Sequence, residues 1–191
     1  MELEISAHHE AGHIVMTYLN GYRCKGFYLK GDGASALDFG TEKELVSAIF
    51  TSIDEGDAFN TLPNTEKIKT PQVAGKVIEI ILGGLVAESI FTKVMGVNST
   101  NSVEVSGEDA KNVDAVEHIL RSLRMINNLP LLDSEIQSTY EVFVKSPEIQ
   151  NAVNKLANEV LANQDHMLSQ EELESVLEDI GFLDYLKDIQ R

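Results

Sequence analysis

The spacing of apolar residues predicts an amphipathic helix at the start of the chain. Over residues 2–19, one face of a helix with 3.6 residues per turn carries Ile5, His9, Gly12, His13 and Met16. The pair Asn20-Gly21 follows as a helix stop signal. We therefore expect both histidines of this face to lie in the middle of a helix.

A second helix is predicted over residues 72–93, which include KVIEIILGGLVAESIF. Apolar residues cover this helix almost all the way round, so we expect it to be buried. Gly83 and Gly84 lie in its middle, and each destabilises a helix by roughly 1 kcal/mol relative to alanine. That penalty is best explained if another helix packs close to the backbone at this point, and the helix over residues 2–19 is the expected neighbour.

Three segments between these helices have weaker patterns. Residues 24–40, CKGFYLKGDGASALDFG, alternate β-forming residues with a glycine-rich turn and predict a short hairpin. A capping box, Thr41-x-x-Glu44, precedes the apolar run LVSAIFTSI, which we interpret as a helix although a strand is nearly as compatible. The polar stretch 54–71 carries two prolines and predicts a long loop.

Helix signals dominate the second half of the chain. One helix is predicted from about residue 108 to 126. Three further helix starts are indicated by Ser134-x-x-Gln137, by Ser146 followed by Pro147, and by Ser169-x-x-Glu172. We find no internal repeat. The sequence therefore predicts a single domain over residues 1–191, mainly α with a small β hairpin.

Composition disfavours several classes of function. Thirty-one acidic and fifteen basic residues give a formal net charge of -16, which repels nucleic acids and anionic lipid surfaces. The acids are scattered, which indicates a solvated surface. No run of 18 apolar residues and no signal-peptide pattern is present, and the single Cys24 cannot form an intramolecular disulfide. We expect a cytoplasmic protein with no nucleic-acid partner and no direct membrane insertion.

The segment HHEAGH, residues 8–13, contains an HExxH motif. On a helix, His9 and His13 lie one above the other, so both imidazoles can ligate one zinc ion at about 2.0–2.1 Å. Glu10 projects about 100° round from His9, where it can deprotonate a zinc-bound water for attack on a carbonyl group. The main alternative is a degenerate site that keeps the motif without a third ligand or a substrate cleft. His8 faces away from the pair and is interpreted as a surface residue or as a residue that supports the ligands without binding the metal.

A catalytic zinc site normally has three protein ligands and one open position. The extended motif with a third histidine is absent, because positions 16 and 19 are Met16 and Leu19. The chemistry of the residues leaves five candidates for the third ligand: Glu88, Asp109, Asp114, Glu117 and His118.

Three segments in order, HHEAGHIV, ILGGLVAESIF and SGEDAKNV, resemble the peptidase domain of the FtsH family, which are membrane-anchored AAA+ zinc proteases. The tail VNKLANEVLANQDHMLSQEEL is also similar to the closing helices of that family. The likeness runs patchily over most of the chain. It implies an FtsH-peptidase-like helical zincin-type fold.

Position by position, the resemblance implies Zn²⁺ bound by His9, His13 and Asp109, with Glu10 as the catalytic base. Gly83 and Gly84 would be packing residues beneath the site. Glu88 matches a buried glutamate of the family and would support a ligand rather than bind the metal. The arginine that follows the two glycines in the family is Leu85 here, which we expect to be partly exposed.

Residues 1–191 contain no G-x-x-x-x-G-K-[ST] phosphate loop. The chain is therefore expected to act as a zinc metallopeptidase without its own motor, hydrolysing flexible or unfolded polypeptides held as an added strand against the 26–40 hairpin. A separate AAA+ ATPase partner could feed it, or the chain could be a fragment or a decayed copy. The alternative is a catalytically inactive FtsH-peptidase-like module that acts as a protein-binding or adaptor domain.

Overall fold

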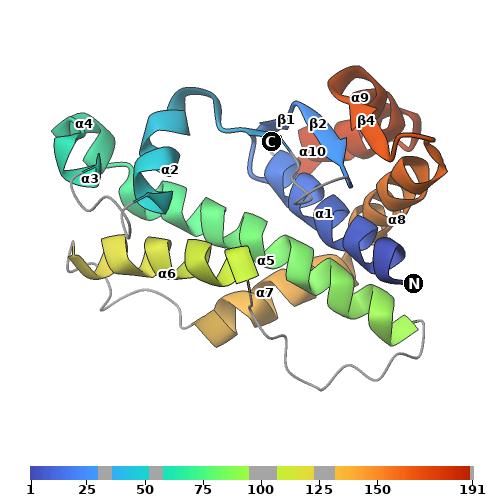
Figure 1. Ribbon diagram of the computed structural model, residues 1–191, viewed down its shortest axis with the longest axis horizontal. Coiled ribbons are helices and arrows are strands. Elements are labelled where there is room, and N and C mark those ends of the chain that lie inside the picture. The colour runs from blue at the N-terminus through green and yellow to red at the C-terminus, as the bar shows by residue number, and fades with distance from the viewer. Residues whose placement is uncertain (30–35, 52–57, 95–106, 123–131, 190–191) are drawn as a thin grey trace.

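The computed structural model describes residues 1–29, 36–51, 58–94, 107–122 and 132–189, and these are mainly helical (Figure 1). In chain order the elements are α1 (Glu2–Leu19), β1 (Arg23–Cys24), β2 (Gly26–Tyr28), β3 (Leu37–Asp38), the 3-10 helix η1 (Gly40–Glu42), α2 (Lys43–Phe50), α3 (Ala58–Thr61), α4 (Asn64–Lys67), α5 (Thr70–Val94), α6 (Gly107–Ser122), α7 (Leu132–Lys145), α8 (Pro147–Ala162), β4 (Met167–Ser169), α9 (Gln170–Asp179) and α10 (Phe182–Ile189).

The centre of the fold is the contact between α1 and α5 (Figure 1). A Cβ atom added to Gly83 would lie 2.8 Å from the carbonyl oxygen of Gly12, and one added to Gly12 would lie 2.7 Å from Cβ of Ala87. Both distances are shorter than real Cβ contacts, so the two backbones touch at positions where only glycine fits. The predicted close packing of these two helices at the glycines is confirmed.

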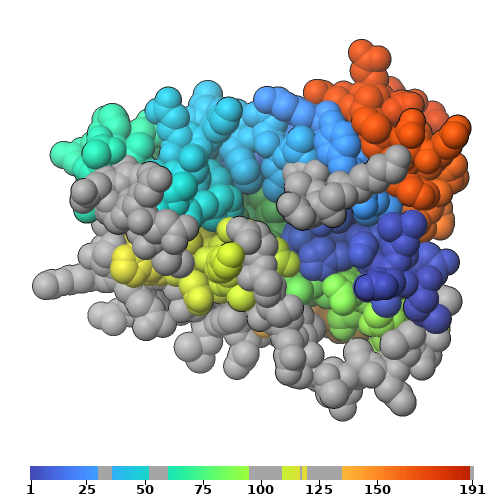
Figure 2. Space-filling view, viewed as in Figure 1, coloured from blue at the N-terminus to red at the C-terminus, as the bar shows by residue number. Residues whose placement is uncertain are grey.

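Two hydrophobic cores meet along α5. The first core lies around α1, the strands and the C-terminal helices, and its largest fully buried side chains are Ile14, Tyr18, Phe27, Phe143, Ile149, Leu156, Leu173 and Phe182. The second core joins α2, α5 and α6 and includes Leu45, Ile49, Val77, Leu82, Leu85, Val116 and Ile119. Figure 2 shows α2 and α6 side by side on one face of the molecule. Leu85 is 8% exposed, so its expected partial exposure is wrong: an apolar residue fits the second core there.

The β structure consists of two short antiparallel pairs. β1 pairs with β3, Cys24 opposite Leu37, which confirms a hairpin within the predicted segment. β2 pairs instead with β4, Phe27 opposite Leu168, and this contact between distant parts of the chain was not predicted. It ties the segment that follows α1 to the C-terminal helices.

Helix boundaries agree with the stronger cap signals. Gly21, with φ of +81°, ends α1 through a backbone N–H that donates to the Tyr18 carbonyl. Ser146 caps α8, with a proline in its first turn, and Ser169 forms a complete capping box with Glu172 at the start of α9. These predicted helix ends are confirmed.

Several weaker predictions are wrong or lie outside the described residues. The helix after Thr41 is confirmed as α2, but its N-cap is Glu42, with no side-chain cap hydrogen bond, so the Thr41–Glu44 capping box does not form there. The start signal at Ser134 falls inside α7, which begins at Leu132. The predicted loop over 54–71 contains the short helices α3 and α4 and the first two residues of α5. Residues 123–126 of the helix predicted over 108–126 are outside the described part.

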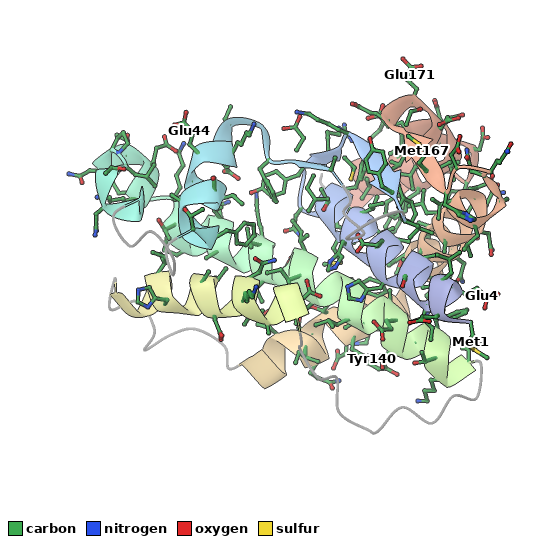
Figure 3. All side chains as sticks on the ribbon, viewed as in Figure 1. Met1, Glu4, Glu44, Tyr140, Met167 and Glu171 are labelled. Atoms are coloured by element: carbon green, nitrogen blue, oxygen red, sulfur yellow. The ribbon has the colours of Figure 1, made fainter. Side chains whose placement is uncertain are left out.

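Acidic side chains point outward from several elements, as Glu44 on α2 and Glu171 on α9 do in Figure 3. This distribution agrees with the expected solvated surface. None of the helices in the described ranges has the length and apolar character needed to cross a membrane.

Candidate metal centre

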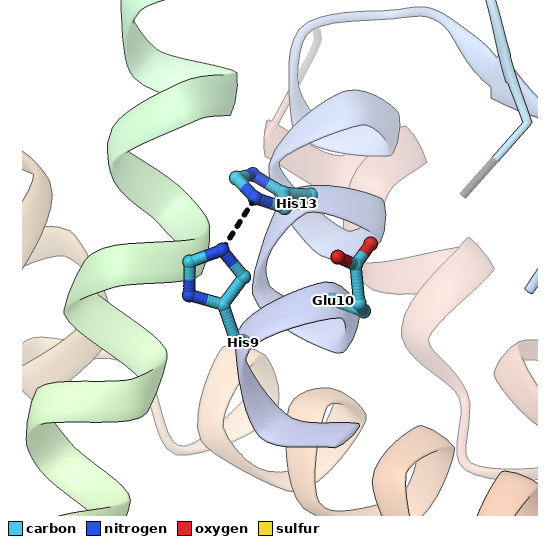
Figure 4. Close-up of side chains that lie close together, drawn as sticks. All are labelled: His9, Glu10 and His13. Atoms are coloured by element: carbon cyan, nitrogen blue, oxygen red, sulfur yellow. Dashed lines mark hydrogen bonds between the residues drawn. The ribbon is translucent and has the colours of Figure 1, made fainter. Parts of the chain in front are cut away.

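His9 and His13 lie one helical turn apart on α1, on the side that faces α5 (Figure 4). Their rings approach edge to face, with 3.0 Å between the two Nε2 atoms. The side chains are 19% and 12% exposed, so the pair is largely enclosed yet still open to solvent on one side.

The other nitrogen of each ring is held by an acceptor on α5. His9 Nδ1 lies 2.9 Å from Glu88 Oε2, and His13 Nδ1 lies 2.8 Å from the Ile80 carbonyl oxygen. Because both partners are hydrogen-bond acceptors, each neutral imidazole carries its hydrogen on Nδ1. The lone pair of each Nε2 then points toward the other histidine. This outer arrangement is the one that metal-binding histidines usually have.

Asp109, in the first turn of α6, completes a group of three donors. Its Oδ2 lies 3.2 Å from His9 Nε2 and its Oδ1 lies 3.8 Å from His13 Nε2. Donors placed tetrahedrally at about 2.0–2.1 Å from one zinc ion are roughly 3.3 Å apart. The Nε2–Nε2 separation of 3.0 Å and the contacts of 3.2 and 3.8 Å, which two different oxygens of Asp109 make, lie around that value, so a small cation could bind between these side chains.

The other candidates for a third ligand differ in position. Asp114 and His118 are exposed further along α6. The side chain of Glu117 lies outside the described part. Glu88 contacts Nδ1 of His9 rather than the shared space between the Nε2 atoms, and its side chain is 41% exposed, so the glutamate is not buried as the resemblance implied.

The electrostatics of the centre favour positive charge. Burial lowers the pKa of the His9 imidazole, but the hydrogen bonds to Asp109 and Glu88 outweigh it and raise that pKa to about 9. A proton on His9 therefore offsets one of the two carboxylate charges, and a net negative charge remains at the centre. The same charges would attract a cation to this position.

Glu10 projects from α1 beside the histidine pair (Figure 4). One carboxylate oxygen lies within 4.8 Å of a ring nitrogen of each histidine, and His9, Glu10 and His13 together form a group that could hold a metal ion. Asp109 Oδ2 lies 3.2 Å from His9 Nε2, a separation expected of two ligands of one small cation. Glu10 also lies near β1: burial raises the pKa of the Cys24 thiol to about 12, and the Glu10 charge adds to that shift.

His8 is a structural residue of the core and not part of this centre. It is only 5% exposed, which corrects the interpretation of a surface residue. Its ring stacks on Phe91 of α5 at 3.7 Å and its Nδ1 donates a hydrogen bond to the Glu4 carbonyl; burial lowers the pKa of His8, and the nearby Asn154 side chain of α8 opposes that shift. His8 thereby joins α1 to both neighbouring helices.

Two features of the centre had no specific signal in the sequence. The Ile80 carbonyl that orients His13 is a backbone group, which any residue type would provide. Gly84 was expected to make room for a helix, but a Cβ atom there would lie 2.5 Å from both Nε2 and Cε1 of His13. The space beside Gly84 is thus occupied by a candidate ligand.

Comparisons with family models, with curated proteins and with solved structures found no match to this chain.

Proposed function

We propose that this protein is a zinc-dependent endopeptidase whose metal is held by His9, His13 and Asp109. The observation that carries the proposal is the convergence of two Nε2 atoms and one carboxylate within 3.0–3.8 Å, with both Nδ1 atoms bonded to acceptors. Two imidazoles and one carboxylate are a donor set suited to zinc. Three protein ligands also leave a fourth position for a reactant.

Within this proposal Glu10 is the general base. When bound, zinc supplies Lewis acidity to a water molecule and to the carbonyl group of the scissile bond. A carboxylate oxygen of Glu10 lies within 4.8 Å of both histidines, so it is within reach of a water molecule at the ligand position. Glu10 takes a proton from that water as its oxygen forms the new C–O bond, and it then delivers the proton to the amine that leaves as the C–N bond breaks.

The remaining residues of the centre hold the ligands in place. Glu88 and the Ile80 carbonyl keep the hydrogen of each imidazole on Nδ1, so that both Nε2 lone pairs face the ion. The packing of α1 against α5 brings these acceptors to the rings.

We propose flexible or unfolded polypeptides as substrates. Among the described residues β3 pairs only with β1, so its other edge can accept an extended peptide by strand addition. The negative charge of Glu10 contributes to the raised pKa of the Cys24 thiol in β1, so this hairpin lies near the proposed base. Residues 1–191 have no phosphate loop, so unfolding of a stable substrate would need a separate AAA+ ATPase partner.

The order of the motifs HHEAGH, GG and the Asp109 segment also supports membership of an FtsH-peptidase-like family. In the fold, the paired glycines contact the HExxH helix and Asp109 approaches the histidine pair, in keeping with that resemblance. We propose that this chain belongs to that family.

The test combines metal content with proteolysis. Purified protein should carry one zinc per chain, and His13→Ala should lose it, whereas His118→Ala, which removes an exposed histidine of α6, should keep it. The parent should digest an unstructured casein-like protein, and a chelator should stop the digestion. A folded chain that never takes up zinc would refute the proposal. Stoichiometric zinc without cleavage of any flexible protein would favour the non-catalytic binding module.

A further inference from the structure

Gly83 and Gly84 are adjacent on α5 but face different parts of α1. A Cβ atom on Gly83 would be too close to Met16 and would lie 2.8 Å from the Gly12 carbonyl oxygen, so this glycine allows the two helices to approach. A Cβ atom on Gly84 would meet only the His13 ring among its three nearest neighbours, at 2.5, 2.5 and 2.9 Å from Cε1, Nε2 and Cδ2. Gly84 therefore leaves space for an imidazole rather than for a backbone.

The His13 ring is held by α5 from two directions. Ile80, one turn before Gly84, accepts the Nδ1 hydrogen at 2.8 Å, and the bare Cα of Gly84 borders the opposite, Nε2 side of the ring. A methyl group at position 84 would push the ring by about 1 Å, because carbon and nitrogen atoms in contact stay roughly 3.5 Å apart. That movement would either break the bond to Ile80 or change the 3.0 Å separation between Nε2 and its counterpart on His9.

We infer that Gly84 is a positioning residue that sets where the ligand nitrogen of His13 lies, and so sets the metal affinity and the coordination geometry of the centre. The inference rests on the proposed function, because it assigns His13 as a metal ligand. It also explains why glycine is present at position 84 when the helix contact itself needs glycine at position 83.

The experiment compares three alanine variants of α5 in the full chain. Gly84→Ala should weaken zinc binding about 10- to 100-fold, the range seen when groups that orient a metal ligand are removed. Gly75→Ala is the matched control, since it adds the same methyl group to the same helix with no atom within 4 Å beyond its chain neighbours and the adjacent helix backbone, and its zinc affinity should equal that of the parent. Gly83→Ala should lower the melting temperature through the helix contact.

Zinc affinity is measured by competition with a chromophoric chelator, and the geometry is followed in the visible absorption bands of Co²⁺ bound in place of zinc. A purely structural role for Gly84 would lower the melting temperature without altering the Co²⁺ spectrum of the folded fraction. Gly84→Ala that binds zinc as tightly as the parent, with an unchanged Co²⁺ spectrum, would overturn the inference.

A double-mutant cycle on metal-free protein keeps the test decisive if Gly84→Ala folds poorly. The melting temperature lost through Gly84→Ala should be largely restored when His13→Ala is added, because the clashing ring is then gone. An equal loss with and without His13→Ala would overturn the inference. A parent chain that binds no metal would refute the proposed function and the effect of Gly84 on metal affinity, whereas the cycle on metal-free protein separately tests whether position 84 places the His13 ring.

Discussion

Replacing Asp109 with asparagine tests the third ligand most directly. Asp109→Asn keeps the shape of the side chain but removes the charge of a carboxylate that lies 3.2 Å from His9 Nε2 and 3.8 Å from His13 Nε2. Glu88 offers a comparison, because it contacts the same ring on the other nitrogen, at 2.9 Å. The two substitutions therefore separate direct ligation from orientation of a ligand.

The expected magnitudes follow from these positions. Loss of a group that orients a ligand typically weakens metal binding about 10- to 100-fold, or roughly 1.4–2.8 kcal/mol, and this is the range expected for Glu88→Gln. A direct ligand contributes more, so Asp109→Asn should weaken zinc binding by more than about 100-fold. Asp114→Asn removes an exposed carboxylate of the same helix and should leave the affinity unchanged.

Zinc affinities of the three variants are measured by competition with a chromophoric chelator, together with melting curves of the metal-free proteins to establish that each is folded. If Asp109 is a direct ligand, the loss of zinc affinity should be largest for Asp109→Asn, smaller for Glu88→Gln and absent for Asp114→Asn. If Asp109→Asn binds zinc like the parent, or loses less affinity than Glu88→Gln, Asp109 is not the third ligand.

Three further results are expected. Glu10→Gln should keep its zinc and its fold while peptide hydrolysis falls by about 10²- to 10⁴-fold, measured as the turnover of a fluorogenic peptide; unchanged turnover would remove Glu10 from the mechanism. Gly12→Ala forces a methyl group against the Gly83 backbone and should lower the melting temperature by about 4–8 °C, a net loss near 2 kcal/mol, whereas Gly75→Ala should not lower it; equal melting temperatures for the parent and Gly12→Ala would refute the close backbone contact. The isolated chain should digest an unstructured protein with no need for ATP and leave a stable folded one intact, because folded proteins stable by about 5–15 kcal/mol rarely expose extended segments; efficient digestion of the folded protein would contradict this.

Local patterns in the sequence predicted the elements whose stability is local. The helix over residues 2–19 agrees with α1, and the helix over 72–93 lies within α5, because hydrophobic periodicity persists over many turns in each. Ser169-x-x-Glu172 predicted the start of α9, since both partners of the capping box lie within one turn. The pairing of β2 with β4 depends on residues about 140 positions apart, and a strand of three residues has no pattern that identifies its partner.

One part of the candidate centre likewise follows from local sequence, and the other part depends on contacts between distant residues. The spacing of His9 and His13 follows from helix geometry alone and could be read from the sequence. Asp109 could not be chosen from chemistry among five candidates, because its approach to the pair depends on how α6 packs on α5 in the second core. The Ile80 carbonyl is a backbone group that every residue type carries, so no residue in the sequence marks its contact with His13. The contact of Gly84 with His13 depends on how two helices cross.

β2 pairs with β4 and α1 packs on α8, so the first part of the chain depends on partners that are synthesised later. Synthesis proceeds from the N-terminus at about 5–20 residues per second, so α1 exists for roughly 7–30 s before the last residue of α8, Ala162, has been made. During that interval the apolar side of α1 that packs on α8 in the folded protein has no partner from that helix. His9, His13 and Asp109 are all made before α8, so the proposed ligands are complete while the core behind them is still unfinished. Until α8 is made, the side of α1 that faces it therefore lacks the contacts that it has in the folded protein.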